Sequence, residues 1–279
     1  MTRFWKMHGL GNDYIVIDNR NGAISCAQAS ELAKKLCKRR FSVGADGVLL
    51  VMNSEVASAR MRIFNADGSE AEMCGNGIRC FAKYCYENGI VKKTEFPIET
   101  LSGPKRVFLT VDGGQVKTVK VDVGEPSWER NALPMAGHGD FIDQNLRVDS
   151  VNLRATCLSM GNPHCVIFVD DVDNYAVDEV GPKIENHKAF PRRTNVEFAQ
   201  VISQGELKLR VWERGCGETL ACGTGTCATV AAANRLGKVG DNVTVHVLGG
   251  DLQVKLAEGK LYLSGGAVKV YEGNLFEET

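Results

Sequence analysis

Cys74-Gly75-Asn76-Gly77 and Cys222-Gly223-Thr224-Gly225 are two copies of one motif, 148 residues apart (222 − 74) in a chain of 279 residues. At the same offset, Arg62-Ile63-Phe64-Asn65 matches Arg210-Val211-Trp212-Glu213 in order and in chemical type. Self-similarity at a fixed offset is typical of repeated structural units. We therefore predict that the chain consists of two similar halves that arose by internal duplication.

A second register of the cysteines, with an offset of 142 residues, has to be weighed against this one. It superposes two sets with the same spacing, namely Cys74, Cys80 and Cys85 on Cys216, Cys222 and Cys227. Such triplets would indicate a metal or iron–sulfur protein. Their flanks match at little more than Gly75 and Gly217, whereas the 148-residue register also matches outside the motif. The chain has no Cys-x-x-Cys, the commonest spacing of zinc and dithiol sites.

Each half has the same predicted order of elements: strand-like runs, a glycine-rich turn with the cysteine, a helix, and alternating strands. Ile78, Phe81, Ala82 and Cys85 recur at helical spacing and predict a helix with one apolar face, which ends at Gly89. In the second half, residues 227–236 are apolar nearly all round. Strand runs joined by 112–113 and 258–259 predict hairpins.

These patterns predict an α+β fold of two pseudo-symmetric domains. In each domain a mixed or antiparallel sheet curls around a central helix, and we expect the active site in the cleft between the domains. The predicted boundaries are residues 1–120 for the first domain and 121–264 for the second. We expect the C-terminal strand 265–279 to pack back on the first domain.

Composition excludes several classes of partner. The net charge is −1, so the chain lacks the broad basic surface that holds a nucleic-acid backbone. No apolar run approaches the ~18 residues that cross a bilayer. The N-terminus has no apolar signal segment, which predicts a cytoplasmic protein without membrane contact. Ten cysteines in a reducing compartment should be thiols.

A cysteine at the start of a helix has a specific chemical use. The helix dipole and free backbone N–H groups favour negative charge there, so a thiolate or a substrate carboxylate is stabilised. Two thiols that face one cleft from opposite domains suit inversion of a carbon that bears a proton. The thiolate removes the proton from one face and the thiol returns one from the other. This chemistry predicts Cys74 and Cys222 as the catalytic pair and requires neither cofactor nor metal.

The motifs also resemble those of a known family, diaminopimelate epimerase, over essentially the whole chain. The resemblance is carried by runs in all parts of the sequence: Met7-His8-Gly9-Leu10-Gly11-Asn12-Asp13, Asn65-Ala66-Asp67-Gly68-Ser69-Glu70, Cys74-Gly75-Asn76-Gly77-Ile78-Arg79, Met160-Gly161-Asn162-Pro163-His164, Glu213-Arg214-Gly215 and Ala221-Cys222-Gly223-Thr224-Gly225. It implies cofactor-independent interconversion of LL- and meso-diaminopimelate, in the biosynthesis of lysine and of peptidoglycan precursors.

The resemblance also implies roles for further residues. His164 and Glu213 would tune the acidity of the two thiols. Substrate contacts would come from Asn12, Asn65, Gly75, Asn76, Asn162, Asn195, Glu213, Arg214, Gly223 and Thr224. Tyr271 matches a tyrosine associated with dimer formation, so a homodimer is expected. Two departures are Gly47, where some relatives have a glutamine that touches substrate, and Cys216, which adds an inert thiol near the site.

Rival functions remain open at this point. Gly9-x-Gly11, Gly75-x-Gly77 and Gly223-x-Gly225 could suggest a nucleotide site, but none continues to a third glycine. A two-thiol racemase of proline or hydroxyproline is the nearest rival among enzymes. The asparagines and Arg214 favour a second amino-acid end on the substrate, as in diaminopimelate.

Overall fold

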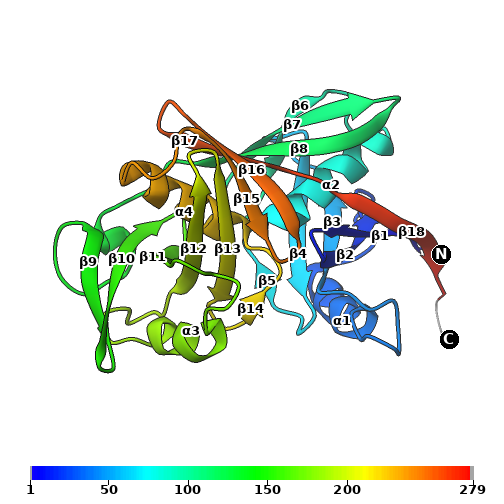
Figure 1. The fold of residues 1–279 in the computed structure, drawn as a ribbon. Coiled ribbons are helices and arrows are strands. Elements are labelled where there is room, and N and C mark those ends of the chain that lie inside the picture. Colours follow the sequence, from blue (N-terminus) through cyan, green and yellow to red (C-terminus); the bar gives the residue numbers. More distant parts are fainter. Residues whose placement is uncertain (1, 277–279) are drawn as a thin grey trace. The chain divides into compact units, whose positions relative to one another are not determined.

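The computed structural model describes residues 2–276, which divide into two compact units (Figure 1). The first unit comprises Met1–Val121 with Ser264–Thr279, and the second comprises Asp122–Leu263. Four α-helices and eighteen strands occur within the described residues. The predicted α+β class is therefore confirmed.

In the first unit, every strand pairs with a neighbour in one continuous ladder. Its elements are β1 (Thr2–Gly9), β2 (Asn12–Asp18), α1 (Cys26–Leu36), β3 (Gly47–Met52), β4 (Ala59–Asn65), β5 (Glu70–Ala71), α2 (Gly75–Glu87), β6 (Glu95–Glu99), β7 (Lys105–Asp112), β8 (Gln115–Gly124) and β18 (Val268–Leu275). The pairing order is β18-β1-β2-β3-β4-β6-β7-β8, with β5 on β4. Only β2–β3 and β4–β6 among these pairs are parallel.

The second unit repeats this succession. Its elements are η1 (Arg130–Ala132), β9 (Phe141–Val148), β10 (Val151–Ser159), β11 (Pro163–Phe168), α3 (Val177–Glu185), β12 (Asn195–Ser203), β13 (Glu206–Glu213), β14 (Gly217–Thr219), α4 (Gly223–Arg235), β15 (Asn242–Val247), β16 (Gly250–Ala257) and β17 (Lys260–Gly265). The pairing order is β9-β10-β11-β12-β13-β15-β16, with β14 on β13. The parallel pairs are β11–β12 and β13–β15.

Each parallel pair is joined by a helix, because parallel neighbours need a crossover connection. Helices α1 and α2 make the crossovers in the first unit, and α3 and α4 make them in the second. The sequence pattern did not predict α1 or α3. Helix α1 buries mainly small residues, Ala29 and Ala33, while α3 is short and contains Gly181 and Pro182, which weaken any helical signal.

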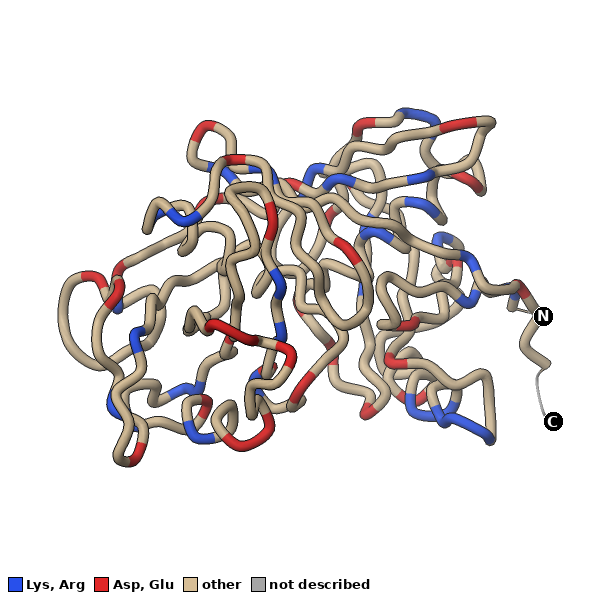
Figure 2. The backbone as a smooth tube through the Cα atoms, in the orientation of Figure 1, with Lys and Arg blue, Asp and Glu red and all other residues tan. Residues whose placement is uncertain are grey.

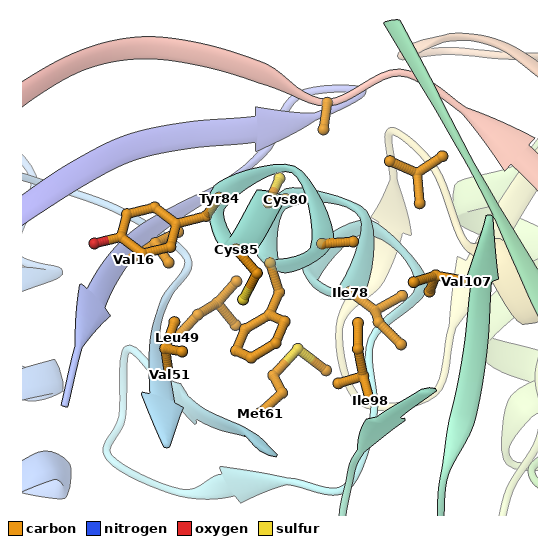
Figure 3. Packing of buried hydrophobic residues seen from close by; sticks show 14 of the residues in the cluster. Val16, Leu49, Val51, Met61, Ile78, Cys80, Tyr84, Cys85, Ile98 and Val107 are labelled. Carbon is orange, nitrogen blue, oxygen red and sulfur yellow. The ribbon is translucent and has the colours of Figure 1, made fainter. Parts of the chain in front are cut away.

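Helix α2 lies inside the main hydrophobic core of the first unit (Figure 3). We predicted one apolar face, but Cys80 and Tyr84, which lie outside that face, are also buried. The helix is covered on nearly all sides because side chains from several strands, among them Val16 and Leu49, pack around it. The helix ends after Glu87, and Gly89 follows with a φ of 67°.

The other face of β2 and β3 packs on α1. Ile15 and Val48 point to this side, while their chain neighbours Val16 and Leu49 point to α2. Because side chains alternate along a strand, a sheet covered by helices on both faces has continuously apolar strands. This explains the uninterrupted burial of β3 from Gly47 to Val51.

The charged residues are mixed in sign along both units (Figure 2). No helix within residues 2–276 is long and apolar enough to cross a membrane. The ten cysteines, all in the described part of the chain, are free thiols.

Candidate active site

Cys74 is the N-cap of α2, with extended backbone angles of φ −141° and ψ 125°. Its sulfur accepts a hydrogen bond from the backbone N–H of Gly77 at 3.4 Å. The side chain is partly exposed. A sulfur at this position receives both a backbone donor and the positive end of the helix dipole, two interactions that stabilise a thiolate.

Tyr14 and Asn12, both on β2, surround the sulfur of Cys74. The phenol oxygen of Tyr14 lies 3.0 Å from Cys74 Sγ and 2.8 Å from Asn12 Oδ1. Asn12 Oδ1 is itself 3.5 Å from the sulfur, and Asn12 Nδ2 donates to Asp46 at 2.8 Å. Tyr14 Oη, Asn12 Oδ1 and Cys74 Sγ thus form a triangle of hydrogen-bonding atoms, and the sulfur is the candidate catalytic atom.

Gly47 and Asn65 lie beside Tyr14 in one row across the sheet. Tyr14 pairs with Gly47 on β3, and Gly47 pairs with Asn65 on β4. A Cβ at position 47 would lie 2.8 Å from the carbonyl oxygen of Phe64 and 3.2 Å from the ring of Tyr14. The glycine therefore makes room for the tyrosine ring, and a larger side chain has no space there. Asn65 donates from Nδ2 to Ser69 at 3.0 Å.

The first turn of α2 is held from inside by Arg79, whose side chain is fully buried. The guanidinium donates to the carbonyl oxygen of Gly75 at 2.9 Å and to Asn76 Oδ1 at 2.7 Å. It also donates to the carbonyl of Gly266 at 3.2 Å. The side chain of Asn76 is therefore engaged in the interior.

Cys222 occupies the same position at the start of α4 as its N-cap. Its sulfur accepts from the backbone N–H of Gly225 at 3.4 Å and lies 3.5 Å from Thr224 Oγ1. Thr224 Oγ1 accepts in turn from Asn162 Nδ2 at 3.3 Å. Unlike Cys74, the Cys222 side chain is almost completely buried.

His164 and Glu197 form a buried pair behind this second cap. His164 Nδ1 lies 2.7 Å from Glu197 Oε1, and both side chains are fully inaccessible. His164 Nε2 lies 3.0 Å from Asn162 Oδ1. Both ring nitrogens thus have oxygen partners, which fixes the orientation of the imidazole. Glu197 Oε2 has no hydrogen-bond partner within the described residues.

Glu213 lies at the end of β13 and accepts a hydrogen bond from the hydroxyl of Thr219. Burial raises the pKa of Glu213, and the nearby Glu197 raises it further, while Thr219 and the Cys222 thiol act in the opposite direction. Burial also raises the pKa of Cys222 well above its usual value, and the carboxylates of Glu213 and Glu197 add to the effect. This environment favours the protonated thiol at Cys222.

The loop after Glu213 is anchored by two interior side chains. Asn195 pairs with His164 across parallel strands, and its Oδ1 accepts from the backbone N–H of Arg214 at 2.9 Å. Glu185 Oε1 accepts from the backbone N–H of Gly215 at 2.8 Å. The Arg214 side chain donates to the carbonyl of Arg192 at 3.3 Å. The loop position is thus set by buried partners, while the Arg214 guanidinium lies at the surface.

The remaining cysteines of the two triplets lie at other places within the two units. Cys80 and Cys85 are fully buried in the core around α2, and Cys227 is fully buried in α4. Burial raises the pKa of Cys80 to about 12. Cys216 is exposed. Within residues 2–276 no group of three His, Cys, Asp or Glu side chains is arranged to hold a metal ion.

Sequence reasoning missed four residues that shape these two sites: Tyr14, Arg79, Glu185 and Glu197. A signal for Tyr14 was available, since Gly11-Asn12 matches Gly161-Asn162 at an offset of 150 residues and the same offset places Tyr14 on His164. The other three lie in helices or strands where a charged residue alone carries no functional signal.

Solved structures similar to this chain define its fold. A probable proline racemase from Agrobacterium radiobacter superposes with a TM-score of 0.72 at 17% identity, covering 100% of this chain and 94% of that one. A phenazine biosynthesis protein of the PhzF family from Bacillus anthracis gives 0.72 at 19% identity, with 99% of both chains covered. The chain therefore has the fold shared by these racemases and PhzF-like proteins.

Sequence comparison narrows the class to one family. The family profile described as diaminopimelate epimerase matches residues 4–129 and 156–274. The diaminopimelate epimerase of Moorella thermoacetica is 50% identical over 97% of this chain and 98% of its own length. That of Pelotomaculum thermopropionicum is 52% identical over 97% of both. The chain belongs to the diaminopimelate epimerase family, which confirms the resemblance seen in its motifs.

Proposed function

We propose that Cys74 and Cys222 act as a two-base pair on the α carbon of diaminopimelate. Family membership gives the activity, epimerisation of diaminopimelate without pyridoxal phosphate, and its place in lysine biosynthesis. The observation that carries the mechanism is the placement of both thiols as N-caps of equivalent helices. Each helix start offers a thiol and backbone N–H donors together.

In the proposed reaction the thiolate of one cysteine takes the α proton and becomes a thiol. The electron pair left on carbon is delocalised into the substrate carboxylate, which the N–H groups at 75–76 and 223–224 stabilise. The other cysteine then donates its thiol proton to the opposite face and becomes the thiolate. One proton is removed and one is added, so the configuration inverts without any change in redox state.

The environments of the two thiols suit different resting forms. Cys74 is partly exposed and accepts hydrogen bonds from Tyr14 and from the backbone of Gly77, whereas Cys222 is buried beside Glu213 and Glu197. We propose that Cys222 rests as the protonated thiol, because burial and the two carboxylates raise its pKa. We propose that His164 and Glu213 tune the acidity of the two thiols, with Glu213 acting on Cys222.

The distal end of the substrate carries an amino group and a carboxylate. We propose that Asn12, Asn65, Asn162, Asn195 and Arg214 provide its contacts. Amide side chains supply both donors and acceptors, and a guanidinium binds carboxylates in a bidentate manner. A pocket that serves only one amino-acid end, as for proline, would not need this set.

Incubation of the protein with LL-diaminopimelate in deuterated water tests the two-base mechanism. The product carbon receives its hydrogen from the thiol on the far face, which has exchanged with solvent. We therefore expect meso product that is almost fully deuterated at first turnover, while unreacted LL substrate is still unlabelled. Proton NMR or mass spectrometry of the two isomers measures this. Early product that keeps the substrate proton would show that a single base acts on both faces.

We also propose a homodimer that includes β18. Tyr271 is 44% exposed on this strand, beside exposed Val268 and Val270, and its ring packs edge-on to Phe4 at 6.1 Å. Exposed apolar side chains on one strand are typical of a surface covered by a partner. Sedimentation velocity should give a dimer for the native chain and a monomer for Tyr271→Glu. A native monomer at micromolar concentration would contradict the proposal.

A further inference from the structure

The phenol of Tyr14 makes direct contact with the sulfur of Cys74, and no role follows for it from the proposed reaction alone. We propose that Tyr14 is a further catalytic residue that donates a hydrogen bond to the Cys74 thiolate and returns this bond to Asn12 when the sulfur is protonated. The inference rests on the proposed function, in which Cys74 alternates between thiolate and thiol.

The geometry allows one phenol proton to serve both states. Tyr14 Oη lies 3.0 Å from Cys74 Sγ and 2.8 Å from Asn12 Oδ1, so it has two acceptors within hydrogen-bond distance and only one proton to give. Rotation about the C–O bond transfers the donor from one acceptor to the other. No heavy atom has to move.

Proton counting shows why this suits an acid–base residue. When Cys74 is a thiolate, Tyr14 donates to the sulfur. When Cys74 has taken the substrate proton, its S–H has an acceptor at Asn12 Oδ1, 3.5 Å away, or at Tyr14 Oη. If the S–H turns to Tyr14, the phenol donates to Asn12 instead. Each state of the sulfur thus keeps a hydrogen-bond partner.

Tyr14 is held in place and keeps its proton. Its side chain is 5% exposed, and burial together with the charge of Cys74 raises the pKa of Tyr14 well above its usual value. The ring is fixed because Gly47 leaves it room and because Asn12 is bound to Asp46. The titratable groups near the triangle are Asp46, which contacts Asn12, and Cys80 of α2.

The equivalent position in the second unit carries a different residue. His164 stands where the repeat places Tyr14, and it contacts Asn162 as Tyr14 contacts Asn12. There, however, the ring is paired with Glu197, and no hydroxyl is directed at the sulfur from this position. The two thiols are therefore served by different groups, which is consistent with different resting protonation states.

Tyr14→Phe tests the proposal, because it removes one hydroxyl and keeps the ring. A hydrogen bond to a charged group contributes about 1.5–3 kcal/mol, which corresponds to about 1–2 pH units. We expect the pH midpoint of Cys74 alkylation by iodoacetamide to rise by about that amount. The tryptic peptide of residues 63–79 contains Cys74 as its single cysteine, so mass spectrometry reads this site alone.

The acidic limb of the kcat/KM profile should move upward by a similar amount, with little change at high pH. Tyr84→Phe is the matched control. Tyr84 is also buried in the core around α2, but it lies ten residues after Cys74, about 15 Å along the helix. It should leave both curves unchanged. Because alkylation does not depend on turnover, the test stays informative if Tyr14→Phe is poorly active.

Unchanged alkylation and rate profiles in Tyr14→Phe would overturn the role of Tyr14 and leave the proposed function standing. An equal shift in Tyr84→Phe would show that the effect is one of packing, and would also overturn it. Full activity of Cys74→Ala, in contrast, would overturn the proposed function itself. The two failures are therefore separable.

Discussion

Cys74→Ala and Cys222→Ala should each lower kcat/KM for diaminopimelate epimerisation by about 10²–10⁴-fold, the usual contribution of one general acid or base. Each variant leaves one face of the α carbon without a group that can give or take a proton. Since each thiol acts in both directions of the reaction, the loss should be similar from the LL and from the meso isomer. Initial rates in both directions, by an assay that separates the isomers, measure it.

Neither substitution should unfold the protein. Each removes one N-cap interaction, the hydrogen bond from Gly77 or Gly225, and loss of an N-cap costs about 0.5–2 kcal/mol. Thermal unfolding followed by circular dichroism checks this. Cys26→Ala and Cys216→Ala remove exposed thiols and are the matched controls, with activity expected at the native level. A Cys74 or Cys222 variant with native rates would refute the two-base scheme.

Much of the fold could be predicted because its signals are local. Apolar runs gave the central strands, glycines marked the helix ends, and the repeat linked the two halves. The missed helices, α1 and α3, carry weak local signals and owe their position to the sheet face that they cover. Tertiary packing overrides propensity in such cases. Burial of Cys80 and Tyr84 also depends on packing by neighbouring strands, so the spacing of apolar residues in α2 does not predict it.

The candidate site was predictable where a motif carries the chemistry, as in the two cysteine caps. The site was not predictable where its function depends on buried side chains, from other elements or later in the same helix, that contact the motif. Glu197 lies in an apolar strand pattern and carries no functional signal in the sequence, yet it is fully buried against His164. Arg79 belongs to the first cysteine motif but has no predicted role, yet its buried guanidinium binds Gly75 and Asn76. Only the neighbours in space decide these cases.

Gly77→Ala and Gly225→Ala should have opposite effects, although the two glycines are equivalent in the repeat. A Cβ at Gly77 would meet Cys74 Cβ and Leu49 Cδ2 at 3.4 Å, close to ordinary contact. Alanine there should be neutral or stabilise the helix by about 0.5–1 kcal/mol. A Cβ at Gly225 would lie 2.7 Å from Glu197 Oε1, which cannot yield without breaking its contact with His164. Overpacking of this kind costs about 1–3 kcal/mol.

Activity should follow the same division. Gly77→Ala should keep native kcat/KM, whereas Gly225→Ala should lose activity because displacement of Glu197 also shifts the groups around Cys222. A double-mutant cycle with Glu197→Ala identifies the cause, since coupling between residues in contact appears as non-additivity. With the carboxylate removed, Gly225→Ala should cost little further stability in calorimetric unfolding. An equal cost in both backgrounds would mean that Glu197 is not the obstacle, and that the glycine is required by the helix start itself.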